Sequence, residues 1–235
     1  MERSPGFRSS TETSPVMGYT LNFSAVWRSF DSLLGGMALS LSLAVVSIVI
    51  GAMIGLVLAF ALISKGWLAR SAKVYVTIFR NLPILVLVLF AYFALPQLGV
   101  SLGKIQSFVL VLAIYSGAYL AEVFRAGLLS IPKGLPEAGL AIGLTPMQIR
   151  ATIIAPLMLR NVLPSLSSTI ISLFKDTSLA AAIAVPELTF EARKINVESF
   201  RVIETWLVTS ALYVAACFLI AALMRFAERK LALPR

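Results

Sequence analysis

An uncharged run from Leu33 to Ile63 most constrains what this chain can fold into. It contains no Asp, Glu, Lys or Arg over about thirty residues, and a helix of about 20 apolar residues already crosses the hydrocarbon core of a bilayer. A segment in lipid must satisfy its backbone hydrogen bonds internally, as a helix does. The run therefore predicts a transmembrane helix with room to tilt.

Four more apolar runs follow, so we expect an all-α integral membrane protein with about five transmembrane helices. The expected spans are residues 33–63, 75–98, 105–129, 161–185 and 202–226. Charged residues make up only 13% of the chain, against about 25% in soluble domains. We expect one transmembrane domain over residues 32–230, with a cytoplasmic segment at 130–149. A polar tail and an interfacial segment over residues 1–31 precede it.

Lys and Arg predict the orientation, because cytoplasmic loops carry an excess of them. One set of alternate segments contains twelve of them: Lys65, Arg70, Lys73, Arg80, Arg125, Lys133, Arg150, Arg160, Arg225, Arg229, Lys230 and Arg235. The opposite set contains seven: Arg3, Arg8, Arg28, Lys104, Arg193, Lys194 and Arg201. We therefore expect the first set and the C-terminus in the cytoplasm, and the N-terminus outside.

Composition also argues against several classes of function. The net charge is +9, but the basic residues punctuate apolar runs and form no basic cluster, so nucleic-acid binding is not expected. The chain has no His and a single cysteine, Cys217, which argues against a metal site, a Ser-His triad and a disulfide. An intramembrane enzyme is the weakest hypothesis, and no catalytic residue is expected. No Gly-x-x-x-x-Gly-Lys-Ser/Thr run is present, so any ATP must be bound elsewhere.

The polar segment between the third and fourth spans, residues 130–149, predicts two short helices with a sharp turn. Pro136 suits the first position of a helix, and Glu137 suits its first turn. Gly143 suits the end of that helix, and Thr145–Gln148 has the pattern of a capping box with proline at the first helical position. Such a firmly capped connector suggests a docking surface, although an idle loop is the alternative.

Glu137-Ala138-Gly139, with Gly143 four residues further on, resembles the EAA signature of ABC importer permeases. The resemblance extends from about Gly35 to Glu228, and one departure is Gly139, where the family usually has Ala. Four other segments resemble the branch that carries polar amino acids such as histidine, glutamine, arginine and glutamate: Phe79–Pro83, Ala118–Gly127, Ser130–Gly134 and Phe174–Leu179.

This resemblance implies a type I importer permease in a bacterial inner membrane, importing polar amino acids by alternating access. Glu137, Ala138, Gly139 and Gly143 would then belong to a coupling helix that sits in a groove of the ATPase. The expected partners are an ABC ATPase dimer that binds ATP and Mg, a second permease chain, alike or homologous, and an extracytoplasmic solute-binding protein. The permease itself would need no cofactor. The alternative is a self-powered secondary transporter or a channel.

Lys175 and Asp176 lie close to the middle of the fourth predicted span. A charge there costs about 2.5–3.5 kcal/mol, and such residues usually face a pathway or one another. Lys175 could donate to the α-carboxylate of an amino acid, and Asp176 could accept from its α-ammonium. Thr177 and Ser178 add neutral hydrogen-bonding groups. The alternative is a structural ion pair with a neighbour such as Glu122.

The sequence Arg80-Asn81-Leu82-Pro83 interrupts the second predicted span. Proline bends a helix and frees backbone polar groups, and the resemblance places Arg80 and Asn81 beside the translocation path. Glu122 and Arg125 are three residues apart, so they can pair with each other on one helix face. Glu122 is also a candidate for direct contact with the substrate.

Overall fold

The computed structural model describes residues 19–231, and this part of the chain contains helices and connections but no strand. Most of the predicted polar tail, residues 1–18, lies outside the described residues. The α-helices are α1 (Ser24–Arg28), α2 (Phe30–Ile63), α3 (Trp67–Asn81), α4 (Ile84–Leu89), α5 (Lys104–Leu129), α6 (Gly134–Ala141), α7 (Pro146–Ile149), α8 (Ala155–Asp176), α9 (Leu188–Ser199) and α10 (Val202–Leu231). Short segments of other helix types continue them. Two are π-helical, η1 (Phe90–Ala94) and η3 (Arg150–Ile154), and two are 3-10 helices, η2 (Leu95–Leu98) and η4 (Thr177–Ile183).

Four helical stretches in the described residues are long and apolar enough to cross a membrane: α2, α5, α10 and the rod over Pro146–Ile183. A fifth crossing is complete if α3 and the helix Ile84–Leu98, bent by 98° at their junction, count as one span. The chain is thus the expected all-α membrane protein. The helices of the second and fourth spans begin earlier than the apolar runs predict, at Trp67 and Pro146, because they continue through charged residues: Arg70 and Lys73 in the second, and Arg150 and Arg160 in the fourth.

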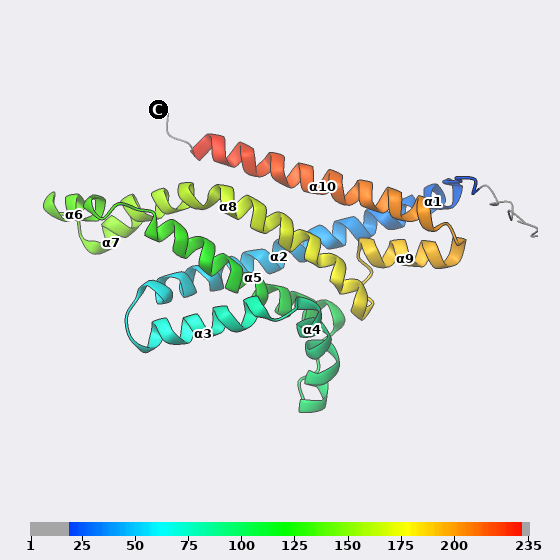
Figure 1. Cartoon of the computed structure of the whole chain (residues 1–235), viewed down its shortest axis with the longest axis horizontal. Helices are drawn as coiled ribbons and strands as arrows, with labels where there is room; N and C mark the ends of the chain where they lie inside the picture. The colour runs from blue at the N-terminus through cyan, green and yellow to red at the C-terminus, as the bar shows by residue number, and fades with distance from the viewer. Residues whose placement is uncertain (1–18, 232–235) are drawn as a thin grey trace, which may run out of the picture.

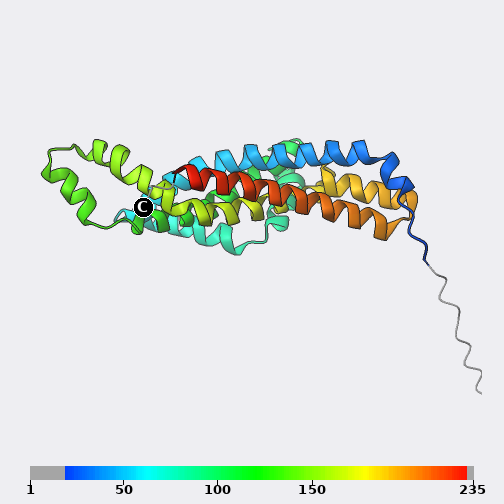
Figure 2. The same ribbon diagram turned by 90° about the horizontal axis from the view of Figure 1, so that it is seen from above.

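The helices run back and forth between two ends of an elongated bundle (Figure 1). The α2–α3 connection, the α6–α7 hairpin and the end of α10 lie at one end, which we call the hairpin end. Helices α1 and α9 lie at the other, which we call the α9 end. Figure 2 shows that the hairpin extends well beyond the neighbouring helices. Among the described residues, Lys65, Lys133 and Arg150 of the larger set lie at the hairpin end, and Arg193 and Lys194 of the smaller set lie in α9 at the other end.

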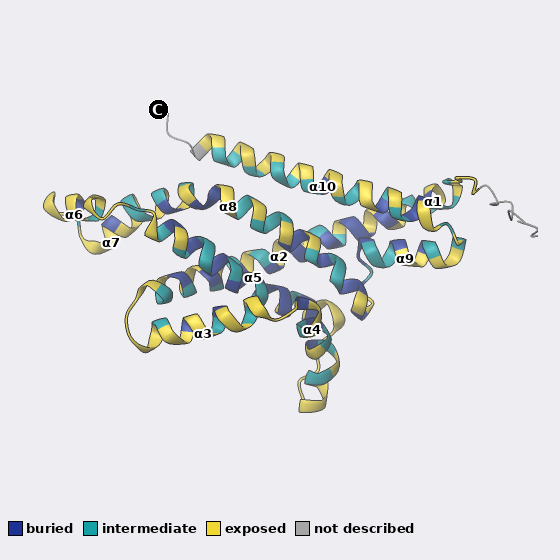
Figure 3. Cartoon of the chain, viewed as in Figure 1, coloured by how far each residue is buried: buried dark blue, intermediate teal, exposed yellow. Residues whose placement is uncertain are grey.

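A stripe of small residues lets α2 approach its neighbours closely. It comprises the buried residues Gly36, Ser40, Ala44, Ser47, Gly51, Gly55 and Ala59. A Cβ at Gly51 would collide with the Ser116 side chain and lie 2.9 Å from the Ala113 carbonyl oxygen of α5. The Ser116 hydroxyl also donates to the Ser47 carbonyl oxygen at 3.3 Å. Small residues permit such contact between backbones in a bilayer, and Figure 3 shows buried residues concentrated along α2 and α5.

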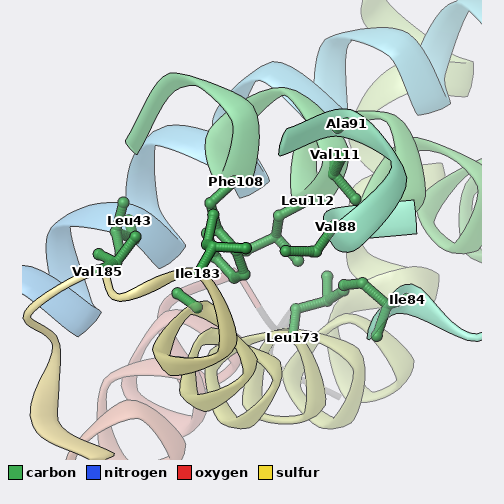
Figure 4. Packing of buried hydrophobic residues seen from close by; sticks show 11 residues of the cluster. Leu43, Ile84, Val88, Ala91, Phe108, Val111, Leu112, Leu173, Ile183 and Val185 are labelled. Atoms are coloured by element: carbon green, nitrogen blue, oxygen red, sulfur yellow. The ribbon is translucent and has the colours of Figure 1, made fainter. Parts of the chain in front are cut away.

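A cluster of apolar side chains fastens the bent second span to this centre (Figure 4). Val88 of α4 and Phe108 and Leu112 of α5 are fully buried in it. Leu43 of α2 and Ile183 of η4 are among the residues that join the cluster from other elements. The packing therefore holds the arm formed by α4 against both α5 and the end of the rod.

Glu187 joins three helices at the α9 end. Its fully buried carboxylate accepts from the Phe190 amide at 2.9 Å, which caps α9. It also accepts from the Ser40 hydroxyl of α2 at 3.2 Å and from the Tyr213 hydroxyl of α10 at 3.0 Å. Burial raises the pKa of this carboxyl, and the four hydrogen-bond donors around it oppose that rise. Removal of any one donor would therefore favour the protonated acid.

The α6–α7 hairpin agrees with most of what its sequence predicts. The capping box is confirmed. The backbone N–H of Gln148 donates to Thr145 Oγ1 at 3.4 Å, and the backbone N–H of Thr145 donates to Gln148 Oε1 at 2.8 Å. Gly143 follows α6 with a φ of 85°, in the left-handed region that favours glycine. The predicted start of α6 at Pro136 is wrong. The helix begins at Gly134, because proline fits anywhere in a first turn, where amides lack intrahelical partners.

We predict that Gly51→Leu lowers the free energy of unfolding by about 1–3 kcal/mol or more. This is the usual cost of forcing a larger side chain into a packed core. The added atoms would have to separate α2 from α5. Gly35→Leu is the matched control, since nothing lies within 4 Å of a Cβ at that position of the same helix. Thermal unfolding of the purified chain in detergent measures the difference. Equal stability of the two variants would contradict this account of the α2–α5 contact.

Candidate functional site

Two adjoining polar cavities lie between α3, α5 and α8, and together we call them the polar groove. The Arg80 cavity has a volume of about 320 Å³ and is lined by Lys73, Val76, Thr77, Arg80, Asn81, Tyr119 and Glu122. The Asp176 cavity has a volume of about 340 Å³ and is lined by Tyr115, Tyr119, Ser168, Thr169, Ser172, Leu173 and Asp176. Tyr119 lines both, so the cavities meet at its side chain.

The break in the second span positions Arg80. Helix α3 ends at Asn81, and Leu82 is extended, with a ψ of 135°, as expected for a residue before proline. The Arg80 guanidinium carbon lies 5.2 Å from the centre of the Tyr119 ring, within range of a cation–π interaction. The Tyr119 hydroxyl donates to the Arg80 carbonyl oxygen at 3.4 Å. The ring of Tyr119 thus holds the end of α3 against α5.

Tyr115 and Tyr119 form the boundary between the two cavities. They are one helical turn apart on α5, with ring centres separated by 4.8 Å. The Tyr115 hydroxyl donates to the Tyr119 hydroxyl at 3.1 Å. A solute that moved from one cavity to the other would therefore pass two aromatic faces and two hydroxyl groups.

Asp176 places a carboxylate in the second cavity. Its side chain is half-buried and makes no hydrogen bond or ion pair with any residue that the structure describes. The hydroxyls of Ser168 and Thr169 in the same cavity donate to the Ser165 carbonyl oxygen at 2.9 and 2.8 Å, so their lone pairs remain free to accept. A carboxylate in a polar cavity of an apolar bundle is suited to bind a cationic group.

The structure brings four of the seven predicted substrate residues together on the polar groove: Arg80, Asn81, Glu122 and Asp176. The other three point elsewhere. Lys175 is exposed and lines neither cavity, because consecutive residues of a helix point about 100° apart. Thr177 is fully buried and donates to the Phe174 carbonyl oxygen at 2.6 Å. Ser178 is half-buried outside both cavities.

The predicted pair of Glu122 with Arg125 is confirmed, with 2.6 Å between the Arg125 Nη2 and Glu122 Oε2 atoms. The alternative structural pair of Lys175 or Asp176 with Glu122 is not found among the described residues. Glu122 therefore lines the Arg80 cavity with its charge already partly balanced.

Sequence reasoning missed the five hydroxyl-bearing residues that line the Asp176 cavity. They are Tyr115, Tyr119, Ser168, Thr169 and Ser172. The signal was present for three of them, since the small hydroxyl residues of α8 precede Asp176 at intervals of three to four and so share its helix face. Within residues 19–231 no three Asp, Glu or Cys residues lie close enough to hold a metal ion.

Comparison with known proteins agrees with this architecture. Residues 47–233 match the family described as binding-protein-dependent transport system inner membrane component. The glutamine transport system permease protein of Escherichia coli (strain K12) is 37% identical over 213 residues, which cover 89% of this chain and 97% of that protein. A probable amino-acid ABC transporter permease protein of Bacillus subtilis (strain 168) is 34% identical over 215 residues, covering 91% and 95%.

Solved structures show the same fold. A chain from a crystal structure of an amino acid ABC transporter with histidines has a TM-score of 0.82 and 28% identity, covering 90% of this chain and all of that chain. A chain of a methionine ABC transporter in an inward-facing conformation has a TM-score of 0.71 at 23% identity, which shows the fold alone. None of these relatives is described as a self-powered transporter or a channel. The chain therefore belongs to the family of binding-protein-dependent transport system inner membrane components, the permease subunits of ABC importers.

Proposed function

We propose that this permease carries a polar amino acid along the polar groove into the cytoplasm, driven by a separate ATPase. The observation that supports this most is the meeting of the Arg80 and Asp176 cavities, which offer a guanidinium and a carboxylate on the two sides of Tyr119. The backbone of a free amino acid presents the complementary charges. The relatives named for glutamine and for amino acids support the same class of substrate.

In this proposal Asp176 accepts hydrogen bonds from the α-ammonium group and Arg80 donates to the α-carboxylate. Asn81 and Glu122 contact the substrate on its way through the Arg80 cavity. Lys175, Thr177 and Ser178 line neither cavity in the single chain. In this proposal they could contribute to substrate binding only in the assembled importer. The exposed ammonium of Lys175 would reach the path only after a second permease chain packs against this one.

We predict that Asp176→Asn lowers the apparent affinity for the amino acid roughly 10- to 100-fold, since a hydrogen bond to a charged group contributes about 1.5–3 kcal/mol. Assembly and basal ATPase activity should remain, because Asp176 makes no ion pair with a described residue. Asp31→Asn, an exposed site outside the groove, is the control. Uptake by proteoliposomes containing the whole importer measures the effect.

Lys175→Met extends the same experiment. If Lys175 joins the substrate site, uptake falls while assembly is kept. Poor assembly of either single variant, together with rescue of both assembly and uptake in the Lys175→Met/Asp176→Asn double variant, would identify a structural pair and exclude the substrate role.

We further propose that the α6–α7 hairpin docks on the ATPase. Apolar side chains are exposed on it, with Leu140 56%, Ile142 77% and Met147 71% exposed, and such a patch beyond the membrane indicates a protein partner. Because Gly139 has no side chain, α6 can pack closely on α7: a Cβ at this position would lie 3.0 Å from the Ile149 side chain. Glu137 and Ala138 are exposed beside it on α6.

We propose the complete importer as two permease chains, alike or homologous, two ATPase subunits that bind ATP and Mg, and an extracytoplasmic solute-binding protein. The family description itself names dependence on a binding protein. Closure of the ATPase subunits would then pull on both hairpins and switch the polar groove between its two accessible states.

We predict that Gly143→Val uncouples ATP hydrolysis from uptake, because a β-branched residue is strained at a φ of 85° and would distort the turn between α6 and α7. Gly134→Val is the matched control, since nothing lies within 4 Å of a Cβ there and its φ is not positive. Glu137→Lys should also uncouple the complex by reversing a charge at the contact. Normal stimulation of ATPase activity and normal uptake in both Gly143→Val and Glu137→Lys would refute the docking proposal.

We propose that the chain resides in a bacterial inner membrane with the hairpin end in the cytoplasm and the α9 end outside, because the hairpin end carries more Lys and Arg. In a Cys217→Ala background, a cysteine at position 194 in α9 should react with a membrane-impermeant maleimide in intact cells. Cysteines at positions 137 and 229 should react only after the cells are opened. The reverse pattern would invert the orientation.

A further inference from the structure

Outside the polar groove, a cavity of about 540 Å³ lies at the hairpin end. It lies where the ends of α2 and α5 meet α6 and η3. Its lining combines basic and apolar side chains: Phe60, Ile63, Ser64, Leu128, Ile131, Lys133, Pro136, Arg150 and Ile154. The polar groove shares none of these residues, so the cavity needs an explanation of its own.

The charge of the cavity is positive. Lys133 and Arg150 are both exposed, and neither forms an ion pair with any residue that the structure describes. Glu137 follows Pro136 directly in α6, yet it does not line the cavity. Two unpaired cations that share a concave surface favour an anionic ligand.

The remaining lining is apolar, which decides between kinds of anion. Phe60 and Ile63 at the end of α2 are 43% and 44% exposed, and Leu128 and Ile154 face the same space. A free phosphate would leave these side chains in contact with water. A lipid would cover them with an acyl chain while its phosphate met the two cations.

The position of the cavity agrees with such a ligand. It lies at the ends of two spanning helices, α2 and α5, where the headgroup layer of a bilayer meets the protein. Basic pockets between spanning helices at this depth are suited to lipid headgroups. We propose that the cavity is a binding site for an anionic phospholipid, with the phosphate on Lys133 and Arg150 and one acyl chain along Phe60 and Ile63.

Such a lipid would act on the hairpin. Lys133 immediately precedes α6, and Arg150 follows α7 directly, so one phosphate would bridge the two ends of the hairpin. Its acyl chain would meanwhile contact the end of α2. The lipid would therefore limit movement of the hairpin relative to the spans.

The test uses the assembled importer in phosphatidylcholine nanodiscs that contain spin-labelled phosphatidylglycerol, with the immobilised lipid measured by electron paramagnetic resonance. We expect Lys133→Gln/Arg150→Gln to weaken the association roughly 10- to 30-fold, since each cation near an anionic lipid contributes about 1 kcal/mol. Arg70→Gln/Arg225→Gln is the matched control, since it removes two exposed cations from the same end but from outside the cavity.

Two further arms separate the possible occupants. Ser64→Phe would fill the cavity without changing its charge and should also weaken lipid binding, whereas Ser64→Ala should not. Inorganic phosphate at millimolar concentration should not displace the lipid. Equal binding by the double variant and its control, displacement by phosphate, or binding that the isolated chain shows and the assembled importer loses would overturn the proposal. Because bound lipid is measured, neither transport nor orientation influences the result.

Discussion

The close contact between α2 and α5 is the constraint on which the rest of the structure depends. Lipid is as apolar as Leu, so burial of large apolar side chains gives spanning helices little reason to associate. Here Gly51 and Gly55 let the two backbones touch, which yields dispersion contacts and a hydrogen bond from Ser116 that longer side chains would prevent. The same stripe continues to Gly36, which makes room for the Glu187 junction.

With α2 and α5 joined, the break at Leu82–Pro83 has a defined effect. Helix α3 runs alongside α5 and stops beside Tyr119, while the apolar segment after Pro83 turns away by 98°. The polar end of α3, with Arg80 and Asn81, thereby lines a cavity against α5. The groove thus exists because one span is interrupted beside a rigid pair, and its charged residues come from three separate stretches of sequence.

Local signals account for what the sequence could predict. Apolar runs indicated the spans, the Thr145 capping box indicated α7, and the spacing of Glu122 and Arg125 indicated their ion pair. Side-chain direction required the folded helix, since Lys175 and Asp176 are adjacent in sequence but point to different surroundings. The contact of Arg80 with Tyr119 joins residues 39 positions apart, which no periodicity within one helix can predict.

The rod over Pro146–Ile183 has a mechanical consequence. Its first turn belongs to the hairpin and its far part carries Asp176, with Pro164 inside the continuous helix. At about 1.5 Å per residue the two points are about 45 Å apart, so a tilt of about 5° at α7 would displace the Asp176 carboxylate by about 4 Å. The rod is therefore a lever arm, and a small rotation outside the bilayer would become a movement as large as the distance between two contacting side chains.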